Sequence, residues 1–198
     1  MSWVSGSPTL YLIRHGETDW NAEGRLQGQR DIPLNARGMV QAEEAGARLR
    51  GIVLDYGELD YWASPLGRTR ETMEVMRAAI GLDPASYRTD ERLKELSFGA
   101  WEGLTWREVR ARDPKGAAAR ERDKWGYDPP GGESYAMLAE RIAPFFAGLE
   151  RDSAVVAHGG VARALLVIRG VAEREKAPRI DIWRGKVLVF RVDGWVWA

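Results

Sequence analysis

Strand-like and helix-like patterns alternate along the whole chain, and this alternation favours an α/β fold around a mostly parallel sheet. Short apolar runs at residues 10–13, 59–63 and 153–157 are predicted to be buried strands. Helical patterns lie between them, and neither repeats nor low-complexity linkers interrupt the series. We therefore expect a single domain over residues 1–198, built as a three-layer α/β/α sandwich.

The predicted helices carry capping signals and apolar faces. Asn35 is expected to cap a helix that Gly51 ends, and Ser64 with Pro65 is expected to open the next one. Pro144 should kink or break a later helix. The side chains expected to face the core are Met39, Ala42, Ala45 and Leu49 in the first helix, Thr72, Met73, Met76, Ala79 and Ile80 in the second, Tyr135, Leu138, Ile142, Phe145, Phe146 and Leu149 in the third, and Val161, Leu165 and Ile168 in the fourth.

Two further segments depart from this alternation. Residues 105–131 contain three prolines and many charges, so we expect short helices and a surface excursion there. The last residues, 186–192 and 195–197, are predicted to form a hairpin that turns at Asp193 and Gly194.

The composition limits the classes of function. Lys plus Arg and Asp plus Glu each number 29, so the formal net charge is zero and no general field attracts nucleic acid or an anionic membrane. The absence of cysteine excludes disulfides and thiol catalysis and agrees with a reducing cytoplasm. Residues 1–8 lack the features of a signal peptide, and no apolar run is long enough to span a membrane. We expect a cytoplasmic protein without nucleic-acid or membrane partners.

Only two histidines are present, and both stand in the same local context. Each lies at the end of a predicted strand and is followed by glycine: His15 by Gly16 and His158 by Gly159. Ligand sites in open parallel sheets form at the carboxyl ends of strands. Glycine there lets the backbone turn sharply and lets a ligand approach closely. We favour one shared site over the alternative of two unrelated histidines in the core or on the surface.

Arginines accompany the same strand ends. Arg14 precedes His15, and Arg68 and Arg70 lie in the segment that joins the second strand to its helix. A guanidinium matches phosphate oxygens with a planar fork of donors, and a helix N-terminus adds free N–H groups and the positive end of its dipole. Each arginine alone could be a solvated surface charge, but their convergence on histidine-bearing strand ends predicts a phosphate site.

These motifs resemble those of the histidine phosphatase superfamily, in particular its cofactor-dependent phosphoglycerate mutase-like branch. The resemblance covers nearly the whole chain and implies a Rossmann-like sandwich and an enzyme that acts on small phosphorylated metabolites. It rests on residues 12–21 (LIRHGETDWN), 26–28 (LQG), 64–72 (SPLGRTRET), 93–103 (LKELSFGAWEG), 132–134 (GES) and 157–160 (AHGG), in family order.

The resemblance also implies a mechanism. Neutral His15 would attack phosphorus and become a phosphohistidine, from which water or a second hydroxyl then takes the phosphoryl group. Arg14, Arg68 and His158 would hold the phosphoryl oxygens, whose charge grows in the transition state. The further residues assigned to the phosphate and substrate pocket, by resemblance or, for Arg70, by its strand-to-helix segment, are Asn21, Gln27, Gly28, Arg70 and Gly159.

An alkoxide leaving group needs a proton donor. Some branches of the superfamily place an aspartate directly after the second histidine, where this chain has Gly159. The mutase-like motif indicates Glu95 instead, with Asp19 as the rival candidate and Glu102 as a weaker one. A carboxylic acid close to the bound phosphate suits this task.

Hydrolysis of a phosphomonoester is the activity we expect, and mutase activity is the alternative. By resemblance, glycolytic mutases are longer and carry an extended tail and basic insertions, whereas this chain ends at Ala198, soon after its predicted hairpin. A regulatory or binding domain of the same fold is a third interpretation, against which the complete set of expected catalytic residues argues. A nucleotide-binding module would need a glycine-rich phosphate loop that is not present.

No metal or bound cofactor is implied, apart from a bisphosphoglycerate primer if the protein is a mutase. Two histidines without cysteine offer few ligands, and an arginine-rich pocket repels cations. The physiological substrate stays open, and so does the oligomeric state, including a homodimer.

By resemblance, residues 105–131 are expected to fold over the mouth of the pocket. Glu133 and Ser134, just beyond, either cap the next helix or belong to the site. The candidates for substrate selection within the excursion, with a solvated surface as the alternative, are Arg120, Arg122, Lys124, Trp125 and Tyr127.

Overall fold

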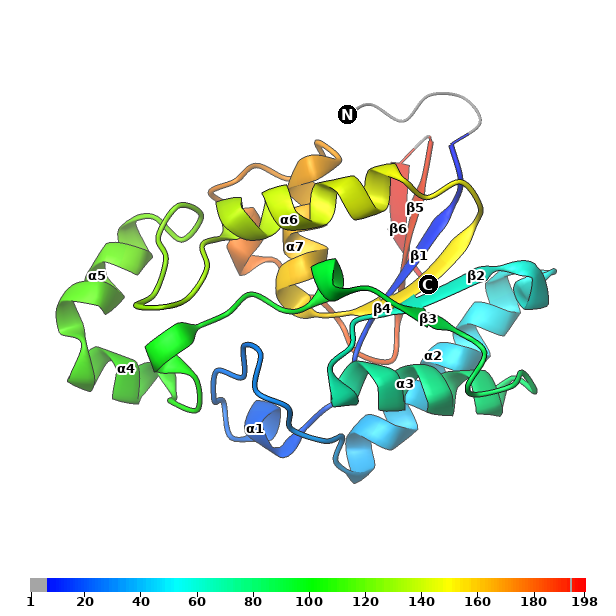
Figure 1. Cartoon of the computed structure of the whole chain (residues 1–198), viewed down its shortest axis with the longest axis horizontal. Coiled ribbons are helices and arrows are strands. Elements are labelled where there is room, and N and C mark those ends of the chain that lie inside the picture. The colour runs from blue at the N-terminus through cyan, green and yellow to red at the C-terminus, as the bar shows by residue number, and fades with distance from the viewer. Residues whose placement is uncertain (1–6, 193) are drawn as a thin grey trace.

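The computed structural model describes residues 7–192 and 194–198, and it has the predicted α/β fold (Figure 1). The strands are β1 (Leu10–Arg14), β2 (Asp60–Ala63), β3 (Arg88–Thr89), β4 (Ser153–Ala157), β5 (Val187–Arg191) and β6 (Gly194–Trp197). They form one sheet in the order β3-β2-β4-β1-β5-β6. The first four in this order are parallel, and β5 and β6 are antiparallel additions at one edge.

Helices cover both faces of the sheet and give the expected three layers. They are α1 (Asp19–Ala22), α2 (Ala36–Ile52), α3 (Gly67–Ala79), α4 (Trp106–Arg112), α5 (Pro114–Arg122), α6 (Tyr135–Ala147) and α7 (Gly159–Ile168). Short 3-10 turns occur at Tyr56–Glu58, Glu91–Leu93, Gly99–Trp101 and Ala177–Arg179. Helices α2 and α3 pack on one face, and α6 and α7 pack on the other (Figure 1).

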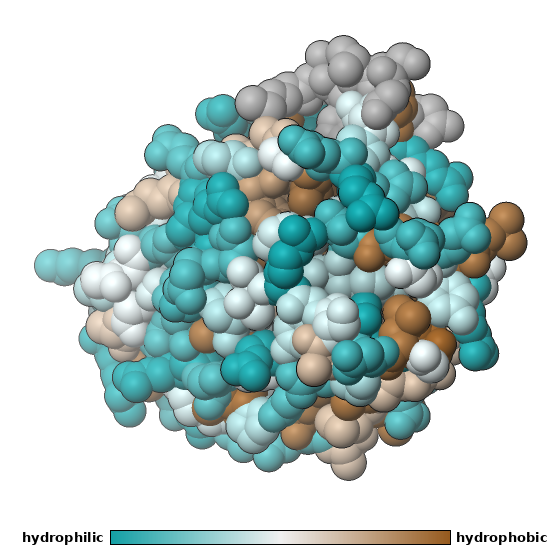
Figure 2. Space-filling model, turned by 45° about the vertical axis from the view of Figure 1, so that its right-hand side comes forward, coloured by the Kyte–Doolittle hydropathy of each residue, from teal (hydrophilic) through white to brown (hydrophobic). Residues whose placement is uncertain are grey.

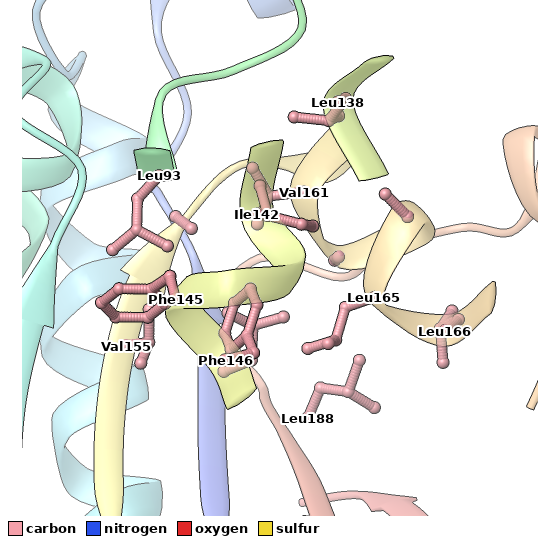
Figure 3. Close-up of a cluster of buried hydrophobic side chains, with 14 of the residues drawn as sticks. Leu93, Leu138, Ile142, Phe145, Phe146, Val155, Val161, Leu165, Leu166 and Leu188 are labelled. Atoms are coloured by element: carbon pink, nitrogen blue, oxygen red, sulfur yellow. The ribbon is translucent and has the colours of Figure 1, made fainter. Parts of the chain in front are cut away.

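Two hydrophobic cores follow from the alternation of side chains along the strands. Leu12 of β1 belongs to the core beneath α6 and α7, whereas the next residue, Ile13, belongs to the core beneath α2 and α3. Figure 3 shows the first of these, in which Phe145 of α6 and Leu165 of α7 gather with Leu188 of β5. Each such buried side chain stabilises the fold by about 1.5–3 kcal/mol. The two cores fix the plane of the sheet, and with it the positions of the strand ends.

Three helix boundaries differ from the predicted ones. Helix α2 continues through Gly51, because one glycine in an exposed last turn costs only about 1 kcal/mol. The helix after β2 begins at Gly67 and not at Ser64. Ser64 is still tied to the sheet, since its N–H donates to the Val156 carbonyl oxygen at 3.0 Å. Pro144 lies exposed in the last turn of α6 and does not break that helix.

The contact between α2 and α3 is closer than the sequence indicated. A Cβ at Gly46 would come within 2.6 Å of the Met76 carbonyl oxygen, so the two helices meet through small residues. The inner face of α2 therefore passes through Gly46 and leaves Met39 41% exposed. Ala79 of α3, also predicted to be buried, is exposed.

Residues 105–131 form the predicted excursion, in which α4 and α5 stand away from the sheet (Figure 1). Asp113 connects the two helices and caps α5, because its side chain accepts from the Gly116 N–H at 2.8 Å. The final strands β5 and β6 form the predicted hairpin, and its expected turn residue Asp193 lies outside the described residues.

The surface is mixed in character. Figure 2 shows hydrophilic side chains over most of the visible face, with hydrophobic ones in scattered spots. None of the described helices combines the length and the apolar composition that crossing a membrane requires.

Candidate active site

The carboxyl ends of β1, β2 and β4 bring three polar side chains together. Strand β4 lies between β1 and β2. His15 after β1, Ser64 after β2 and His158 after β4 therefore meet where the carboxyl ends of these three strands lie side by side. The backbone N–H of His15 donates to the Ala157 carbonyl oxygen at 3.0 Å, and this bond ties the two strand ends that carry the histidines to each other. The two imidazole rings lie 5.2 Å apart between centroids.

His15 is held as a neutral imidazole with one free nitrogen. Its side chain is buried, and its Nδ1 lies 2.7 Å from the carbonyl oxygen of Gly16. A carbonyl oxygen only accepts, so Nδ1 carries the proton and Nε2 keeps its lone pair. Burial, followed by the charges of Arg68, Arg14 and Arg184, holds the pKa of His15 well below its usual value of 6.5. The ring is therefore uncharged at neutral pH, and its Nε2 lone pair could act as a nucleophile.

The loop after His15 is fixed against two helices. The Gly16 N–H donates to the Thr72 hydroxyl at 3.0 Å, and that hydroxyl donates to the Arg68 carbonyl oxygen at 2.7 Å. A Cβ at Gly16 would collide with the Gly38 carbonyl oxygen of α2. The loop that follows His15 is thus coupled to α3, the helix that carries Arg68.

Two guanidinium groups of the site lack a carboxylate partner. Arg68 is 1% exposed and donates to the Arg30 and Gly28 carbonyl oxygens at 2.6 and 2.8 Å, and Arg14 donates to the Ile182 carbonyl oxygen at 2.9 Å. In both side chains Nε is buried without a partner, and neither residue forms an ion pair within the described part of the chain. Burial lowers both pKa values, that of Arg14 to about 9. Buried cations with unpaired donors are costly, so this pair suits a bound anion.

His158 is buried with a partner at each ring nitrogen. Nε2 lies 2.8 Å from the Ser64 hydroxyl oxygen, and Nδ1 lies 3.3 Å from Nη2 of Arg68. Burial, followed by the charges of Arg68, His15 and Arg14, holds the pKa of His158 well below its usual value. The ring is therefore neutral as well.

The Glu95 carboxylate lies at the N-terminus of α7, where the helix dipole favours negative charge. Its Oε2 accepts from the Gly160 N–H at 3.0 Å, and its Oε1 accepts from the Leu96 N–H at 2.8 Å. Each oxygen keeps a second lone pair for a proton or a ligand. Glu95 is thus held in place by two backbone N–H groups.

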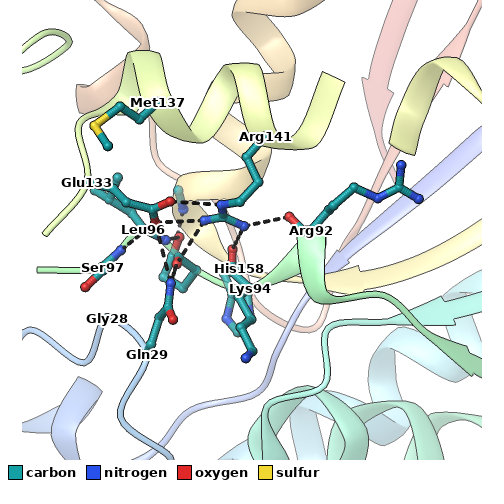
Figure 4. A network of polar contacts seen from close by, with 12 residues as sticks. Gly28, Gln29, Arg92, Lys94, Leu96, Ser97, Glu133, Met137, Arg141 and His158 are labelled. Atoms are coloured by element: carbon teal, nitrogen blue, oxygen red, sulfur yellow. Dashed lines mark hydrogen bonds and ion pairs between the residues drawn. The ribbon is translucent and has the colours of Figure 1, made fainter. Parts of the chain in front are cut away.

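A polar network around Arg141 and Glu133 fixes the backbone of the segment that carries Glu95 (Figure 4). Arg141 of α6 forms a two-pronged ion pair with Glu133, at 2.9 and 2.8 Å. Glu133 therefore supports the Glu95 segment, while Ser134 caps α6. The backbone carbonyl oxygens that accept from Arg141 are those of Arg92, Lys94 and Glu95, at 2.7, 3.0 and 3.4 Å.

The side chains of Arg14, His15, Arg68 and Glu95 line a cavity of about 1010 Å³, whereas His158, also predicted to belong to the site, and Ser64 are buried and are not part of its lining. Its volume lies at the upper end of the usual range for small-molecule sites. The predicted site residues that line it are Arg14, His15, Asn21, Gln27, Gly28, Arg68, Glu95 and Gly159. The other basic residues that line it are Arg25, Arg110, Arg120, Lys124 and Arg163.

Arg70 does not belong to the cavity, contrary to the prediction. It is exposed, and its Nε lies 3.4 Å from the Tyr87 hydroxyl. Successive residues of a helix are rotated by about 100°, so two positions separate the directions of Arg68 and Arg70 by about 200°. Because α3 begins at Gly67, Arg68 faces inward and Arg70 faces solvent.

Of the three carboxylates considered as proton donors, Glu95 alone lines the cavity. Asp19 is exposed in α1. Glu102 accepts from the Gln29 and Phe98 N–H groups at 3.0 and 3.2 Å and so organises a loop. Within the described residues, no group of three or more histidine and acidic side chains is placed to hold a metal ion.

The excursion contributes two of its five predicted candidates to the cavity, Arg120 and Lys124. Arg122 is exposed outside it. Trp125 stacks on Tyr135 and Tyr127 stacks on Trp101, each with centroids 5.7 Å apart, so these two residues attach the excursion to segments on either side of it.

Sequence reasoning missed part of the site. The link from Ser64 to His158 joins residues that are distant in sequence, so no local pattern indicates it. Arg163 could have been found, because it lies four positions after Gly159 and so on the same face of α7. Trp106 reaches the cavity only through the placement of α4.

Comparison with known proteins identifies the family of the chain. The family model of the histidine phosphatase superfamily, branch 1, matches residues 10–198. A 2,3-bisphosphoglycerate-dependent phosphoglycerate mutase from Parvibaculum lavamentivorans is 30% identical over 193 residues, which cover 93% of this chain and 90% of the relative.

Solved structures show the same likeness. The protein TTHB049 from Thermus thermophilus is 37% identical, with a TM-score of 0.71 over 92% of this chain and 93% of that chain. A putative alpha-ribazole-5'-P phosphatase from Escherichia coli shares the fold, with a TM-score of 0.79 at 24% identity over 97% of this chain and 95% of that chain. The chain therefore belongs to the histidine phosphatase superfamily.

Proposed function

We propose that the protein hydrolyses small phosphomonoesters through a phosphohistidine intermediate at His15. The observation that carries this proposal is the buried neutral imidazole of His15, whose Nε2 is free, in a site with the unpaired guanidinium groups of Arg14 and Arg68. A dianionic phosphoryl group would balance both cations and lie against the nucleophile. Membership of the histidine phosphatase superfamily supports the same chemistry.

In the first proposed step, Nε2 of His15 attacks phosphorus in line with the ester oxygen. The N–P bond forms, the P–O bond breaks, and protonated Glu95 gives its proton to the leaving alkoxide. Arg14, Arg68 and His158 stabilise the negative charge that spreads over the other phosphoryl oxygens.

In the second proposed step, water takes the phosphoryl group. The Glu95 carboxylate accepts a proton from water as the water oxygen attacks phosphorus and the N–P bond breaks. Nε2 of His15 regains its lone pair, and inorganic phosphate leaves. Asn21 and the Gly159 N–H, which both line the cavity, are further donors for the phosphoryl oxygens.

The size of the cavity favours hydrolysis over a mutase reaction. A mutase must protect its phosphoenzyme from water until a second hydroxyl arrives. A cavity of about 1010 Å³ leaves room for water beside a small metabolite. Mutase activity is the second candidate, and the name of the relative from Parvibaculum lavamentivorans favours it.

A product assay separates the two candidates. With 3-phosphoglycerate and a bisphosphoglycerate primer, we expect inorganic phosphate to accumulate faster than 2-phosphoglycerate, and a panel of other phosphorylated metabolites covers the case in which this substrate is refused. Phosphate release and isomer formation are measured in the same reaction. Efficient isomerisation with little phosphate released would overturn the choice of hydrolysis.

Arg68 and Arg70 form a matched pair for testing the phosphate site. Arg68→Gln should lower kcat/KM for p-nitrophenyl phosphate by about 10²–10³-fold, as expected when a preorganised donor to the transition state is lost. Arg70→Gln removes the same charge two positions away on the solvent side of α3, and its kcat/KM should stay unchanged. Equal losses in both variants would show that net charge, and not the placement of Arg68, governs the rate.

The cavity lining supports a substrate whose remainder is polar or carries a second negative charge. Arg110, Arg120 and Arg163 line the cavity without an ion pair among the described residues, whereas Lys124 is paired with Glu121 of the same lining at 3.1 Å. The guanidinium of Arg120 lies 4.6 Å from the ring centroid of Trp106, and Arg120 forms no ion pair among the described residues. Since arginines neutralise the phosphate, we propose that no metal or cofactor takes part, apart from a primer under the mutase alternative. The cysteine-free chain and a metabolite substrate support a cytoplasmic location.

A further inference from the structure

We propose that Ser64 is a positioning residue that determines which nitrogen of His158 serves the phosphate site. Its hydroxyl accepts from Nε2 of His158 and so holds the ring in the orientation in which Nδ1 faces Arg68 and is kept for the phosphoryl group. The role of His158 as a phosphate ligand rests on the proposed function. The protonation pattern of its ring rests on the geometry alone.

Ser64 is anchored on both sides of its Cα. Its N–H donates to the Val156 carbonyl oxygen at 3.0 Å, and its own carbonyl oxygen accepts from the Thr69 hydroxyl at 2.8 Å. The residue is fully buried, and its hydroxyl oxygen lies 2.8 Å from Nε2 of His158. The hydroxyl is therefore a fixed partner and not one of several solvent contacts.

The directions of the hydrogen bonds follow from what each group can do. A guanidinium only donates, so Nδ1 of His158 accepts from Nη2 of Arg68 across 3.3 Å. A neutral imidazole carries one proton, which then sits on Nε2 and is donated to the Ser64 oxygen. The partners of the ring thus select one tautomer.

A phosphoryl group bound beside Arg68 requires Nδ1 of His158 to change from a hydrogen-bond acceptor to a donor. Phosphoryl oxygens accept, and the lone pair of Nδ1 would repel them. A monoanionic phosphate can give its proton to Nδ1: the O–H bond breaks, an N–H bond forms, and a dianion faces an imidazolium. A dianionic phosphate would instead require one proton from solvent. In either case the Ser64 hydroxyl oxygen accepts from Nε2 of His158 both before and after Nδ1 gains its proton. His158 can therefore become a donor to the phosphoryl group without turning its ring.

The sequence makes this pattern unusually easy to observe, because only two histidines contribute imidazole signals. In ¹⁵N NMR of the untagged chain, His15→Gln identifies the signals of His158. For the free protein we expect Nε2 of His158 to be protonated and Nδ1 to be bare. On saturation with inorganic phosphate we expect both nitrogens of His158 to be protonated.

Ser64→Ala should lose this pattern. Without the acceptor, the ring can turn away from Arg68 and should populate both tautomers. Phosphate affinity and kcat for p-nitrophenyl phosphate should each fall by about 10-fold to 100-fold, the range expected for a lost hydrogen bond to a charged group. Ser153→Ala is the matched control, because it removes another buried serine hydroxyl, one that donates to the Arg151 carbonyl oxygen at 2.7 Å at the opposite end of β4 from His158. It should lower the melting temperature yet leave the nitrogen pattern and the phosphate affinity unchanged.

Three results would overturn the proposal: a free protein with the proton on Nδ1 of His158, a Ser64→Ala variant with the wild-type nitrogen pattern, or equal changes in Ser153→Ala and Ser64→Ala. The first is read from the wild-type protein and does not depend on a variant folding. Failure of wild type to bind phosphate would contradict the proposed function instead, and the free-state pattern would still decide the role of Ser64.

Discussion

Replacement of His15 by glutamine should reduce kcat/KM for p-nitrophenyl phosphate by about 10⁴-fold or more, the scale seen when a catalytic nucleophile is removed. Glutamine has a similar reach, and its amide N–H can still donate to the Gly16 carbonyl oxygen. It offers no nitrogen lone pair that can attack phosphorus. Steady-state kinetics across a range of substrate concentrations measure the loss.

The phosphate site should survive this substitution, because Arg14 and Arg68 remain in place. The control for folding is therefore the binding of inorganic phosphate or vanadate to His15→Gln, measured by calorimetry. A folded variant that binds phosphate and still turns over at a rate close to wild type would show that His15 is not the nucleophile.

The second large effect concerns Glu95, whose importance should depend on the leaving group. A p-nitrophenolate departs without help, whereas an alkoxide needs a proton in the transition state. Glu95→Gln keeps the size of the side chain but has no acidic proton. General acid catalysis contributes about 10²–10⁴-fold, so the variant should lose that much more rate on an alkyl phosphate than on p-nitrophenyl phosphate when phosphorylation of His15 limits both.

Part of the loss will be common to both substrates, because the amide also disturbs the contacts of Glu95 with the Leu96 and Gly160 N–H groups. The difference between the substrates isolates the proton transfer. Asp19→Asn is the control, since Asp19 is exposed outside the cavity and should show no such difference. An equal fall on both substrates in Glu95→Gln would mean that Glu95 orients phosphate or water and does not protonate the leaving oxygen.

The strand ends could be predicted from sequence because their signals are local. The apolar runs before His15 and His158 identify buried strands, and parallel strands share the edge at which they end. The neighbouring positions of β1 and β4 then bring the two histidines together. The same reasoning placed Arg14 and Arg68 at this edge, and the structure brings both to the cavity.

The misplacement of Arg70 shows where such reasoning ends. Whether Arg68 or Arg70 faces inward depends on the residue at which α3 begins, and Ser64 is tied to the sheet by a bond to Val156 that no local pattern reveals. The hydrogen bonds from Arg141 to the Lys94 and Glu95 carbonyl oxygens also join residues that are distant in sequence. Contacts between segments that are distant in sequence set these details, and propensity and periodicity describe only neighbours.

The most direct test of the proposed chemistry is to trap the intermediate. The protein is mixed with substrate, quenched without acid, digested and examined by mass spectrometry. We predict a phosphoryl group on the peptide that carries His15, labile to acid and absent from His15→Gln. Turnover without any phosphorylated histidine peptide, or a phosphoryl group on His158 in place of His15, would contradict the mechanism.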